Sequence, residues 1–399
     1  MRSTLRARKM RIGVDATCWA NGRGYGRFTR EIIPAMAALA SGDEFVCFLD
    51  PLSESSFDVD LPNIRKVVVS DIREAPMRAA SAATSRSLND MLRLTNAVRA
   101  ESLEVFFSPA VYSYFPLPPG LRAVVTIHDA IPEKFPDLTL PSWRARLFWK
   151  LKVRLAIMQA RRILTVSNYA ASDLVRILGI DRDRITVATE AASAAFYPAT
   201  GENLTPATAA LVGRRRWFTY VGGFNPHKNV PVLIRAHATL SRELGNDAPI
   251  LLLVGTRDRD EFFSEVPTIL SEIERQGTGS LVKWTGFVED EILRGIHSRS
   301  LGLVLPSDTE GFGLPAVEAA ACGSPIIATR ESPLPELLAG GGFFVAPRDE
   351  NALISSMREL ATNGDLHRRL GQAALEAAKR LSWESSARAA LASIRDAAA

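Results

Sequence analysis

The feature that most constrains the fold is a repeated alternation of short apolar runs with segments of helix length. Runs that are apolar throughout are typical of parallel strands covered by helices on both faces. The runs are Arg11–Asp15, Phe45–Leu49, Lys66–Val69, Val105–Phe107, Ala123–Ile127, Ile163–Val166 and Ile185–Val187, then Trp217–Val221, Ile250–Val254, Val282–Trp284, Gly302–Leu305, Ile326–Ala328 and Gly342–Val345. This pattern predicts an α/β fold with two parallel sheets.

A polar segment, Pro198–Pro206, separates the two series of runs and is typical of a linker. A chain of 399 residues is long enough for two domains with separate cores. We therefore expect one Rossmann-like domain over residues 1–205, a second over 206–380, and a C-terminal helix over 381–399. Whether this helix crosses back to the first domain stays open. Ligands of open α/β sheets bind beyond the carboxyl ends of the strands, so we expect a ligand in the cleft between the domains.

Composition excludes several classes of protein. The three cysteines, Cys18, Cys47 and Cys322, are far apart and form no CxxC pair, so neither a disulfide framework nor a thiolate zinc site is expected. A reducing, cytoplasmic compartment fits this pattern.

The basic segment Met1–Met10 precedes a strand rather than an apolar signal core, and we find no uncharged apolar run that could span a bilayer. The net charge of +4 permits anionic ligands without requiring nucleic acid, and no nucleic-acid partner is expected.

The densest motif follows the run Gly302–Leu305 and consists of a glycine loop and a helix. Pro315 suits a first helical position and Gly323 suits a C-terminal cap, which together bound the helix. Gly311 and Gly313 let backbone N–H groups approach a ligand closely, and the start of a helix favours phosphate. A glycine pair after a strand is weak evidence by itself, because it also serves simply to turn the chain. The motif nevertheless predicts a diphosphate site.

The spacing Glu310-x7-Glu318, with Gly-Phe-Gly-Leu-Pro inside it and Glu-Ala-Ala-Ala-Cys-Gly-Ser-Pro-Ile-Ile-Ala from Glu318 onward, resembles the family-4 glycosyltransferases of the GT-B fold. This resemblance implies that Glu310 contacts hydroxyls of the donor sugar and that Glu318 binds the ribose. It also implies that the amides of Phe312, Gly313 and Leu314 support the sugar and the phosphates, beside Gly311. The alternative is that both glutamates are simply solvated.

A second loop, within Tyr220–Asn229, ends the first strand of the second series. Lys228 is placed there to neutralise charge on a departing diphosphate, although a loop lysine is more often a surface residue. The loop resembles the family's basic dipeptide, usually Arg-Lys, with His227 in place of the arginine. Gly223 lies where some members carry another arginine. We expect Lys228 in a catalytic role, with His227 and Gly223 in donor binding.

His128 follows the run Ala123–Ile127, at the carboxyl end of an apolar strand. The pair His128-Asp129 resembles the family's His-Asp motif, which implies that His128 touches the donor sugar near the reacting carbon. A lone histidine at such a place is otherwise more often structural. With Glu310 and Lys228, His128 completes the expected catalytic set.

The first strand is followed by a glycine-rich segment, Asn21–Phe28, that leads into a helix ending near Leu39. Its glycines do not have the Gly-x-Gly-x-x-Gly spacing of a dinucleotide site, so we interpret the segment as a glycine-rich lip of the cleft. The resemblance places Gly24 near the donor diphosphate, and Tyr25 and Arg27 on the acceptor side.

Three further features bear on the site. Ser167 is best interpreted as a helix N-cap. Glu190 stands where the family usually has an Asn-Gly-Val-like turn, which puts the hinge-side contacts in doubt. Asp-x-Asp pairs bind metals in another class of glycosyltransferases, but the three pairs here lie in polar connections or charged segments, so neither a metal nor a cofactor is expected. The pairs are Asp58/Asp60, Asp181/Asp183 and Asp258/Asp260.

The segment Trp143–Arg154 is both basic and aromatic. One interpretation places it on an anionic membrane surface, at the inner face of the membrane, as a peripheral contact. The other interpretation, which we prefer from sequence, is a helix that packs on the core and has a basic outer face.

The resemblance implies a retaining transferase that moves a hexose from a nucleotide-diphosphate sugar to a glycan or lipid-linked glycan. Tyr220–Asn229 and Ser332–Glu336 are most similar to bacterial mannosyl- and rhamnosyltransferases of surface polysaccharide synthesis, which favours GDP-mannose as donor. Two alternatives stay open. One is a phosphorylase or sugar-phosphate transferase on the same fold, and the other is a catalytically silent assembly partner.

Overall fold

The computed structural model describes residues 9–70, 72, 87–140, 142–199, 204–257 and 264–399. The chain divides into two compact units. The first unit comprises residues 1–136, 140–190 and 383–399, and the second comprises 137–139 and 191–382. The second unit therefore begins before the expected boundary at 205/206, and residues 200–203 of the expected linker lie outside the described residues.

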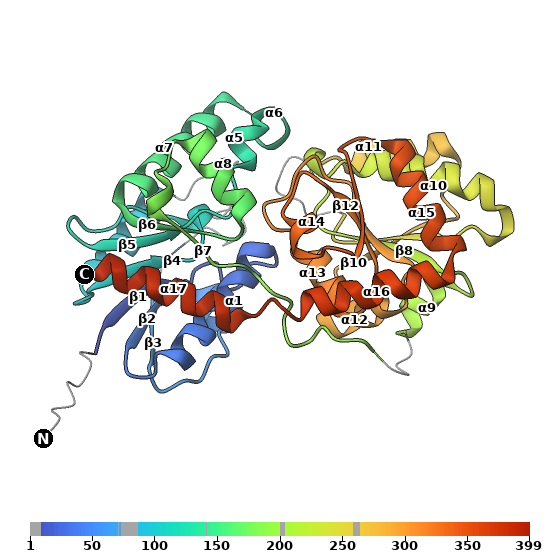
Figure 1. The fold of residues 1–399 in the computed structure, drawn as a ribbon. Coiled ribbons are helices and arrows are strands. Elements are labelled where there is room, and N and C mark those ends of the chain that lie inside the picture. The colour runs from blue at the N-terminus through green and yellow to red at the C-terminus, as the bar shows by residue number, and fades with distance from the viewer. Residues whose placement is uncertain (1–8, 71, 73–86, 141, 200–203, 258–263) are drawn as a thin grey trace, which may run out of the picture. The chain divides into compact units, whose positions relative to one another are not determined.

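The first unit contains a seven-stranded parallel sheet with the strand order β3-β2-β1-β4-β5-β6-β7 (Figure 1). The strands are β1 Arg11–Asp15, β2 Glu44–Leu49, β3 Ile64–Val68, β4 Val105–Ser108, β5 Arg122–Thr126, β6 Ala160–Thr165 and β7 Ile185–Val187. All four residues of β4 are buried, as are the last four of β5. These strands are largely apolar because helices cover both faces of the sheet.

The helices of the first unit begin at side-chain caps in several places. Ser87, Ser142 and Ser167 each accept a hydrogen bond from a backbone N–H in the first turn, and the cap at Ser167 confirms its interpretation from sequence. The helices are α1 Gly24–Leu39, α2 Pro51–Ser55, α4 Leu88–Arg99, α5 Ile131–Lys134, α7 Trp143–Gln159, α8 Asn168–Leu178 and α17 Trp383–Ala398, with short 3-10 turns at Val111–Ser113 and Arg182–Arg184. The short helix α6, Pro136–Thr139, has its last three residues in the second unit.

The C-terminal helix α17 belongs to the first unit, although the chain reaches it from the second (Figure 1). It packs against α1 and lies along β4 to β7. The rings of Phe28 and Trp383 meet edge to face with centroids 5.8 Å apart, and Ser386 donates a hydrogen bond to the carbonyl of Thr189. Helices α7 and α8 pack on a core cluster that includes Val125 and Ile163.

The second unit contains a six-stranded parallel sheet with the order β10-β9-β8-β11-β12-β13. Its strands are β8 Trp217–Val221, β9 Ile250–Val254, β10 Val282–Gly286, β11 Gly302–Leu305, β12 Ile326–Thr329 and β13 Gly342–Val345. Its helices are α9 Pro206–Val212, α10 Val230–Leu244, α11 Val266–Gln276, α12 Asp290–Arg299, α13 Leu314–Ala321, α14 Leu334–Leu337, α15 Glu350–Thr362 and α16 Gly364–Ala378, with 3-10 turns at Pro226–Lys228 and Gly245–Asp247.

The expected fold, two parallel-sheet Rossmann-like units, is confirmed. Every predicted run forms a strand, and the bounds shift by only a few residues, as where the run predicted at Ile163–Val166 forms the strand Ala160–Thr165. Strands β8 and β11 are neighbours in the second sheet, so the loops that follow them lie side by side. This adjacency places the two predicted donor loops together.

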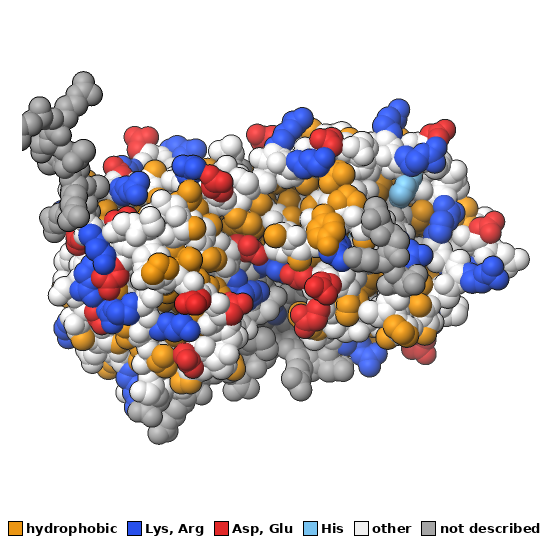
Figure 2. Space-filling model, turned by 90° about the horizontal axis from the view of Figure 1, so that it is seen from below, with side chains coloured by type: hydrophobic (Ala, Val, Ile, Leu, Met, Phe, Trp, Pro, Cys, Tyr) orange, Lys and Arg blue, Asp and Glu red, His pale blue; other side chains and the backbone are white. Residues whose placement is uncertain are grey.

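The described surface carries charges of both signs. On the face of the molecule shown in Figure 2, Lys and Arg side chains are interspersed with Asp and Glu side chains. Among the described residues, no helix is long and apolar enough to cross a membrane.

Candidate active site

The loop after β11 turns the chain into α13 at Gly313. This residue has φ 90°, and a Cβ atom built there would lie 2.8 Å from Cδ1 of Leu334, so a side chain would be strained by the backbone conformation and crowded by Leu334. The Gly313 carbonyl accepts from the N–H of Ala316, and Pro315 lies in the first turn of the helix. At the other end Gly323 has φ 77° just past the helix. Both helix limits predicted from Pro315 and Gly323 are confirmed.

Glu310 and Lys228 form a partly buried ion pair. The Lys228 ammonium lies 2.8 Å from Oε1 of Glu310 and 2.9 Å from Oε2, and the Ser307 hydroxyl donates to Oε1 at 2.5 Å. The Glu310 side chain is 9% exposed, and that of Lys228 is 21% exposed. The structure therefore places Lys228 and Glu310, which the sequence assigned to one catalytic set, in direct contact.

Backbone hydrogen bonds fix the loop that carries Lys228. The Lys228 N–H donates to the carbonyl of Asn225, and the Asp308 N–H donates to the carbonyl of His227 at 2.8 Å. Asn229 is left-handed with φ 56°, and its amide donates to the carbonyl of Pro306 at 3.3 Å. The loops after β8 and β11 are thus joined to one another, which holds Lys228 beside Glu310.

Glu318 and Gly223 also lie in the second unit. Glu318 is buried on α13, about one turn from its first residue, Leu314. The carbonyl of Gly223 accepts a hydrogen bond of 2.5 Å from the Tyr220 hydroxyl. Gly311 and Phe312 are buried in the loop between Glu310 and Gly313. The donor-binding roles of these residues remain predictions.

Sequence reasoning missed an ion pair beside this site. Arg348 donates two hydrogen bonds of 2.9 Å to the two carboxylate oxygens of Asp308, and its backbone is left-handed with φ 63°. Burial and the nearby Asp308 raise the pKa of Glu265 to about 7, while Arg348 opposes that rise. The one available signal was the position of Asp308, directly after the strand that leads to Glu310.

In the first unit, His128 lies just beyond the carboxyl end of β5. Its Nε2 atom is 2.9 Å from the carbonyl oxygen of Pro109, and its Nδ1 atom is 3.5 Å from Oε1 of Glu190. The ring of Phe28 meets the imidazole edge to face at 4.9 Å. Both ring nitrogens therefore face oxygen atoms of the protein.

Glu190 is a functional candidate that the sequence marked only as a departure from its family. The carboxyl is buried, and burial raises its pKa, with a further rise from Asp129 and an opposing effect of His128. Because Pro109 can only accept, Nε2 of His128 carries a proton, and Nδ1 and Glu190 then need one further proton between them. The two residues are far apart in sequence, so only the fold reveals their contact.

The glycine-rich segment is less of a loop than the sequence suggested. Helix α1 begins at Gly24, so Gly24, Tyr25 and Arg27 lie in its first turn. Gly26 is closely packed there: a Cβ atom would lie 2.0 Å from the carbonyl oxygen of Asn21, so a larger residue would push the helix start away from the preceding turn. Whether Gly24 contacts the donor stays a prediction.

The acceptor-side candidates have partners within the first unit. The ring of Tyr25 stacks on that of Tyr112 at 4.9 Å, and Arg27 is 4.0 Å from Glu31. The ring of Tyr112 also contacts that of Trp149, and the indole N–H of Trp149 donates to Glu133 at 2.7 Å. Burial raises the pKa of Glu133 to about 7, against the opposing effect of that indole. Tyr25 therefore lies at one end of a row of aromatic rings, Tyr25, Tyr112 and Trp149, whose other end contacts the partly buried carboxyl of Glu133.

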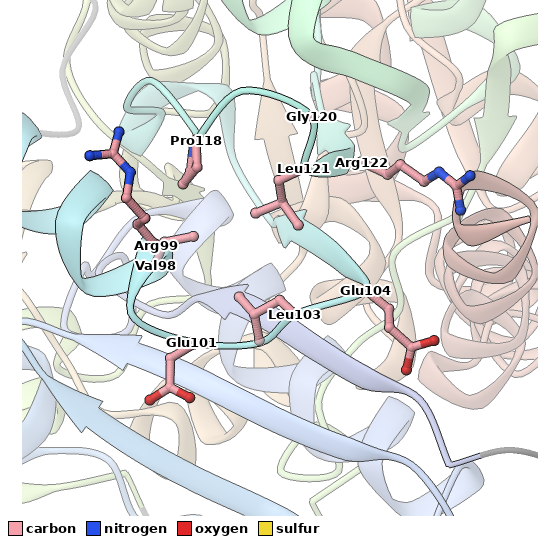
Figure 3. Close-up of a pocket in the computed structure, with 9 residues that line it drawn as sticks. All are labelled: Val98, Arg99, Glu101, Leu103, Glu104, Pro118, Gly120, Leu121 and Arg122. Atoms are coloured by element: carbon pink, nitrogen blue, oxygen red, sulfur yellow. The ribbon is translucent and has the colours of Figure 1, made fainter.

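A pocket in the first unit lies away from these residues. Its volume is about 440 Å³, and it lies where β4 and β5 begin, at the opposite edge of the sheet from His128 (Figure 3). In Figure 3, Leu103 and Leu121 point toward its centre, while the charged ends of Glu101 and Glu104 point outward. The pocket is not part of the candidate site.

Two of the Asp-x-Asp pairs, Asp58/Asp60 and Asp181/Asp183, are exposed, and the third, Asp258/Asp260, lies outside the described residues. Within the described part of the chain, no group of three or more His, Cys, Asp or Glu residues is arranged to hold a metal ion.

Comparison with known proteins identifies the family. The profile described as Glycosyltransferase Family 4 matches residues 22–189, and that described as Glycosyl transferases group 1 matches residues 206–377. The chain belongs to glycosyltransferase family 4. It is therefore a retaining glycosyltransferase of the GT-B fold.

Among its relatives is the O-antigen chain mannosyltransferase B of Escherichia coli, 27% identical over 371 residues that cover 90% of this chain and 93% of that protein. Two solved structures support the fold of this family-4 chain. Sucrose-phosphate synthase from Thermosynechococcus elongatus has a TM-score of 0.74 at 20% identity, covering 97% of this chain and 99% of the other. HepE from Anabaena, in complex with UDP and glucose, has a TM-score of 0.72 at 16% identity, covering 97% and 100%.

Proposed function

We propose that this glycosyltransferase moves a hexose from a nucleotide-diphosphate sugar to a glycan or lipid-linked glycan acceptor in bacterial polysaccharide synthesis. The observation that carries the proposal is the Lys228–Glu310 ion pair next to the start of α13. It combines an ammonium group that can hold phosphate oxygens, a carboxylate that can accept from sugar hydroxyls, and a helix start that favours anions.

In the proposed reaction, the bond between the anomeric carbon and the donor phosphate oxygen breaks. The acceptor oxygen bonds to the same face of that carbon, and the acceptor proton passes to the departing phosphate oxygen. Lys228 stabilises the charge that develops on the diphosphate, and Glu310 orients the sugar through its hydroxyls. No nucleophile from the enzyme is needed, and no metal takes part in this proposal.

For the donor, we propose GDP-mannose. The supporting observation is that the Escherichia coli relative matched over most of both chains is a mannosyltransferase. A thermal-shift comparison of GDP, UDP and their sugars tests this, because selective binding raises apparent stability. A larger shift with UDP-sugars than with GDP-mannose would refute the donor assignment and leave the transfer itself untouched.

The transfer is tested by NMR of the product formed from a donor of known anomeric configuration. Retention supports the proposed mechanism, and inversion would refute it. Two controls address the alternatives. A phosphorylase would use inorganic phosphate and need no ribose contact, so Glu318→Ala would leave its activity unchanged. A silent assembly partner would neither hydrolyse nor transfer any donor.

The proposed compartment is the cytoplasm. All three cysteines, Cys18, Cys47 and Cys322, are free and buried, which is compatible with a reducing environment.

A further inference from the structure

Helix α7 has apolar side chains on two different faces. The inner face packs on the core of the first unit through Ala145, Trp149, Val153 and Ala156, which are all buried. The outer face consists of Trp143, Leu147, Phe148, Leu151, Leu155 and Met158, whose side chains are between 44% and 79% exposed. A surface helix ordinarily has one apolar stripe, directed at the core, and solvated residues on the opposite side. The outer stripe therefore needs its own explanation.

The exposed residues form one continuous surface. Trp143, Leu147, Leu151 and Leu155 follow each other in steps of four, so they lie along the same side of the helix. Phe148 and Met158 lie beside this row. Scattered apolar side chains are common on protein surfaces, but a contiguous row that includes a tryptophan and a phenylalanine marks an interaction site.

The charge of α7 indicates what this surface contacts. The helix contains five basic residues and no acidic residue, whereas both signs mix on the face shown in Figure 2. Lys152 is partly buried and donates to the carbonyl of Tyr112 at 3.1 Å, and Arg146, although exposed, donates to the carbonyl of Leu140 at 3.5 Å. The other three, Arg144, Lys150 and Arg154, are exposed beside the apolar row.

We propose that the outer face of α7 is a docking surface for an anionic lipid membrane. The apolar row would enter the boundary between headgroups and acyl chains, while Arg144, Lys150 and Arg154 would contact the anionic headgroups. Tryptophan is favoured in this boundary because its ring is apolar and its N–H is polar. With 17 residues and five positive charges, α7 suits a position on the membrane and not across it.

Charge argues against a second copy of the chain as the occupant. Two α7 helices packed face to face would bring basic residues together, and α7 has no carboxylate to compensate them. The surface lies in the first unit and the Lys228–Glu310 pair in the second, so the proposal stands independently of the donor assignment. The membrane proposal does agree with a lipid-linked acceptor, because such an acceptor would be presented at the membrane surface.

The experiment is co-sedimentation of the full chain with vesicles of phosphatidylcholine alone or mixed with phosphatidylglycerol. We expect binding to the anionic vesicles, weakening as salt is raised, and little binding to the neutral ones. The apolar variant Phe148→Ser with Leu151→Ser and the charge variant Lys150→Glu with Arg154→Glu are each expected to weaken binding at least about tenfold.

Matched controls separate this surface from general effects of exposed residues. Phe148 and Leu151 are 55% and 48% exposed, and Leu52 and Leu270, in other helices, are 53% and 42% exposed. Leu52→Ser with Leu270→Ser is therefore expected to bind vesicles like the unchanged chain. Arg368→Glu with Arg388→Glu changes the net charge as much as the α7 charge variant does, and should weaken binding far less. Thermal unfolding and nucleotide binding establish that each variant is folded.

Three outcomes would overturn the proposal. The first is no binding to anionic vesicles by the folded chain. The second is equal binding by the α7 variants and their controls. The third is a stable dimer, detected by analytical ultracentrifugation, that the α7 variants abolish while vesicle binding is absent. Failure of the proposed transfer would instead appear as absent donor binding in a chain that still binds vesicles.

Discussion

Replacing Glu190 by glutamine is expected to remove a pH dependence that the unchanged chain has. Nε2 of His128 donates to Pro109 at 2.9 Å, so Nδ1 must accept a proton from Glu190 or share one with it across 3.5 Å. A glutamine amide can donate to Nδ1 without any proton from solvent. Glutamine therefore preserves the contact at every pH, whereas glutamate preserves it only while the pair holds its proton.

The sign follows from the pKa of Glu190, which burial raises above its ordinary value of 4.5. The folded chain then holds this proton more tightly than the unfolded chain, so the corresponding stability is fully present below pH 4.5 and is lost as pH rises through the raised pKa. Glu190→Ala leaves Nδ1 of the buried His128 without its partner, which should cost about 1–3 kcal/mol. Glu190→Gln should cost less than about 1 kcal/mol near neutral pH.

Thermal unfolding checks this reasoning. At mildly acidic and mildly alkaline pH, it should show a smaller pH dependence for Glu190→Gln than for the unchanged chain. Glu54→Gln removes the same charge from an exposed site in the first unit and serves as the control. Equal pH dependence in Glu190→Gln and the unchanged chain would refute the shared proton, as would a Glu190→Ala variant as stable as Glu190→Gln.

Four further variants test other parts of the molecule. Lys228→Ala should lower kcat by about 10²–10³, in initial-rate assays, because it removes a charge that stabilises the leaving diphosphate. Gly313→Ala should destabilise the chain by about 1–3 kcal/mol in urea unfolding, since φ is 90° and Leu334 occupies the space of a Cβ atom. Glu318→Ala should reduce the thermal shift caused by nucleotides; an unchanged shift would exclude the ribose contact. Burial raises the pKa of Glu133 to about 7, so its stabilising contribution should disappear as pH rises through about 7, and Glu133→Gln should abolish that change in unfolding temperature.

The strands were predictable because a strand that is buried on both faces has apolar residues at successive positions. A strand such as β9, Ile-Leu-Leu-Leu-Val, has no polar position, so its interpretation does not depend on knowing which face meets the core. Helix α7 is only partly predictable. Its apolar residues occupy two faces, and the sequence alone does not distinguish a buried Trp149 from an exposed Trp143. The interpretation preferred from sequence, a helix that packs on the core and has a basic outer face, agrees with the buried inner residues and with the exposed Arg144, Lys150 and Arg154, but it does not include the exposed apolar row.

The site was predictable only as far as it is local. Glu310, Gly313 and Glu318 lie in one segment, where spacing and residue type are informative. The contact between His128 and Glu190 depends on segments that follow β5 and β7, two strands separated by β6 in the sheet. No local pattern joins such residues, so a position that looked like a departure from the family proved to be a partner of a predicted catalytic residue.

The Lys228–Glu310 pair also changes how the two residues are understood. From the sequence, Lys228 is expected at the diphosphate and Glu310 at the sugar. In the structure, the charges of the two side chains neutralise each other. A partly buried lysine without a partner would be costly, so the pair keeps the site stable before a donor arrives. In the proposed reaction, an incoming diphosphate would replace Glu310 as the partner of Lys228, and donor hydroxyls would replace Lys228 at the carboxylate. The ion pair therefore holds both groups near their proposed positions, which lowers the cost of ordering them on binding.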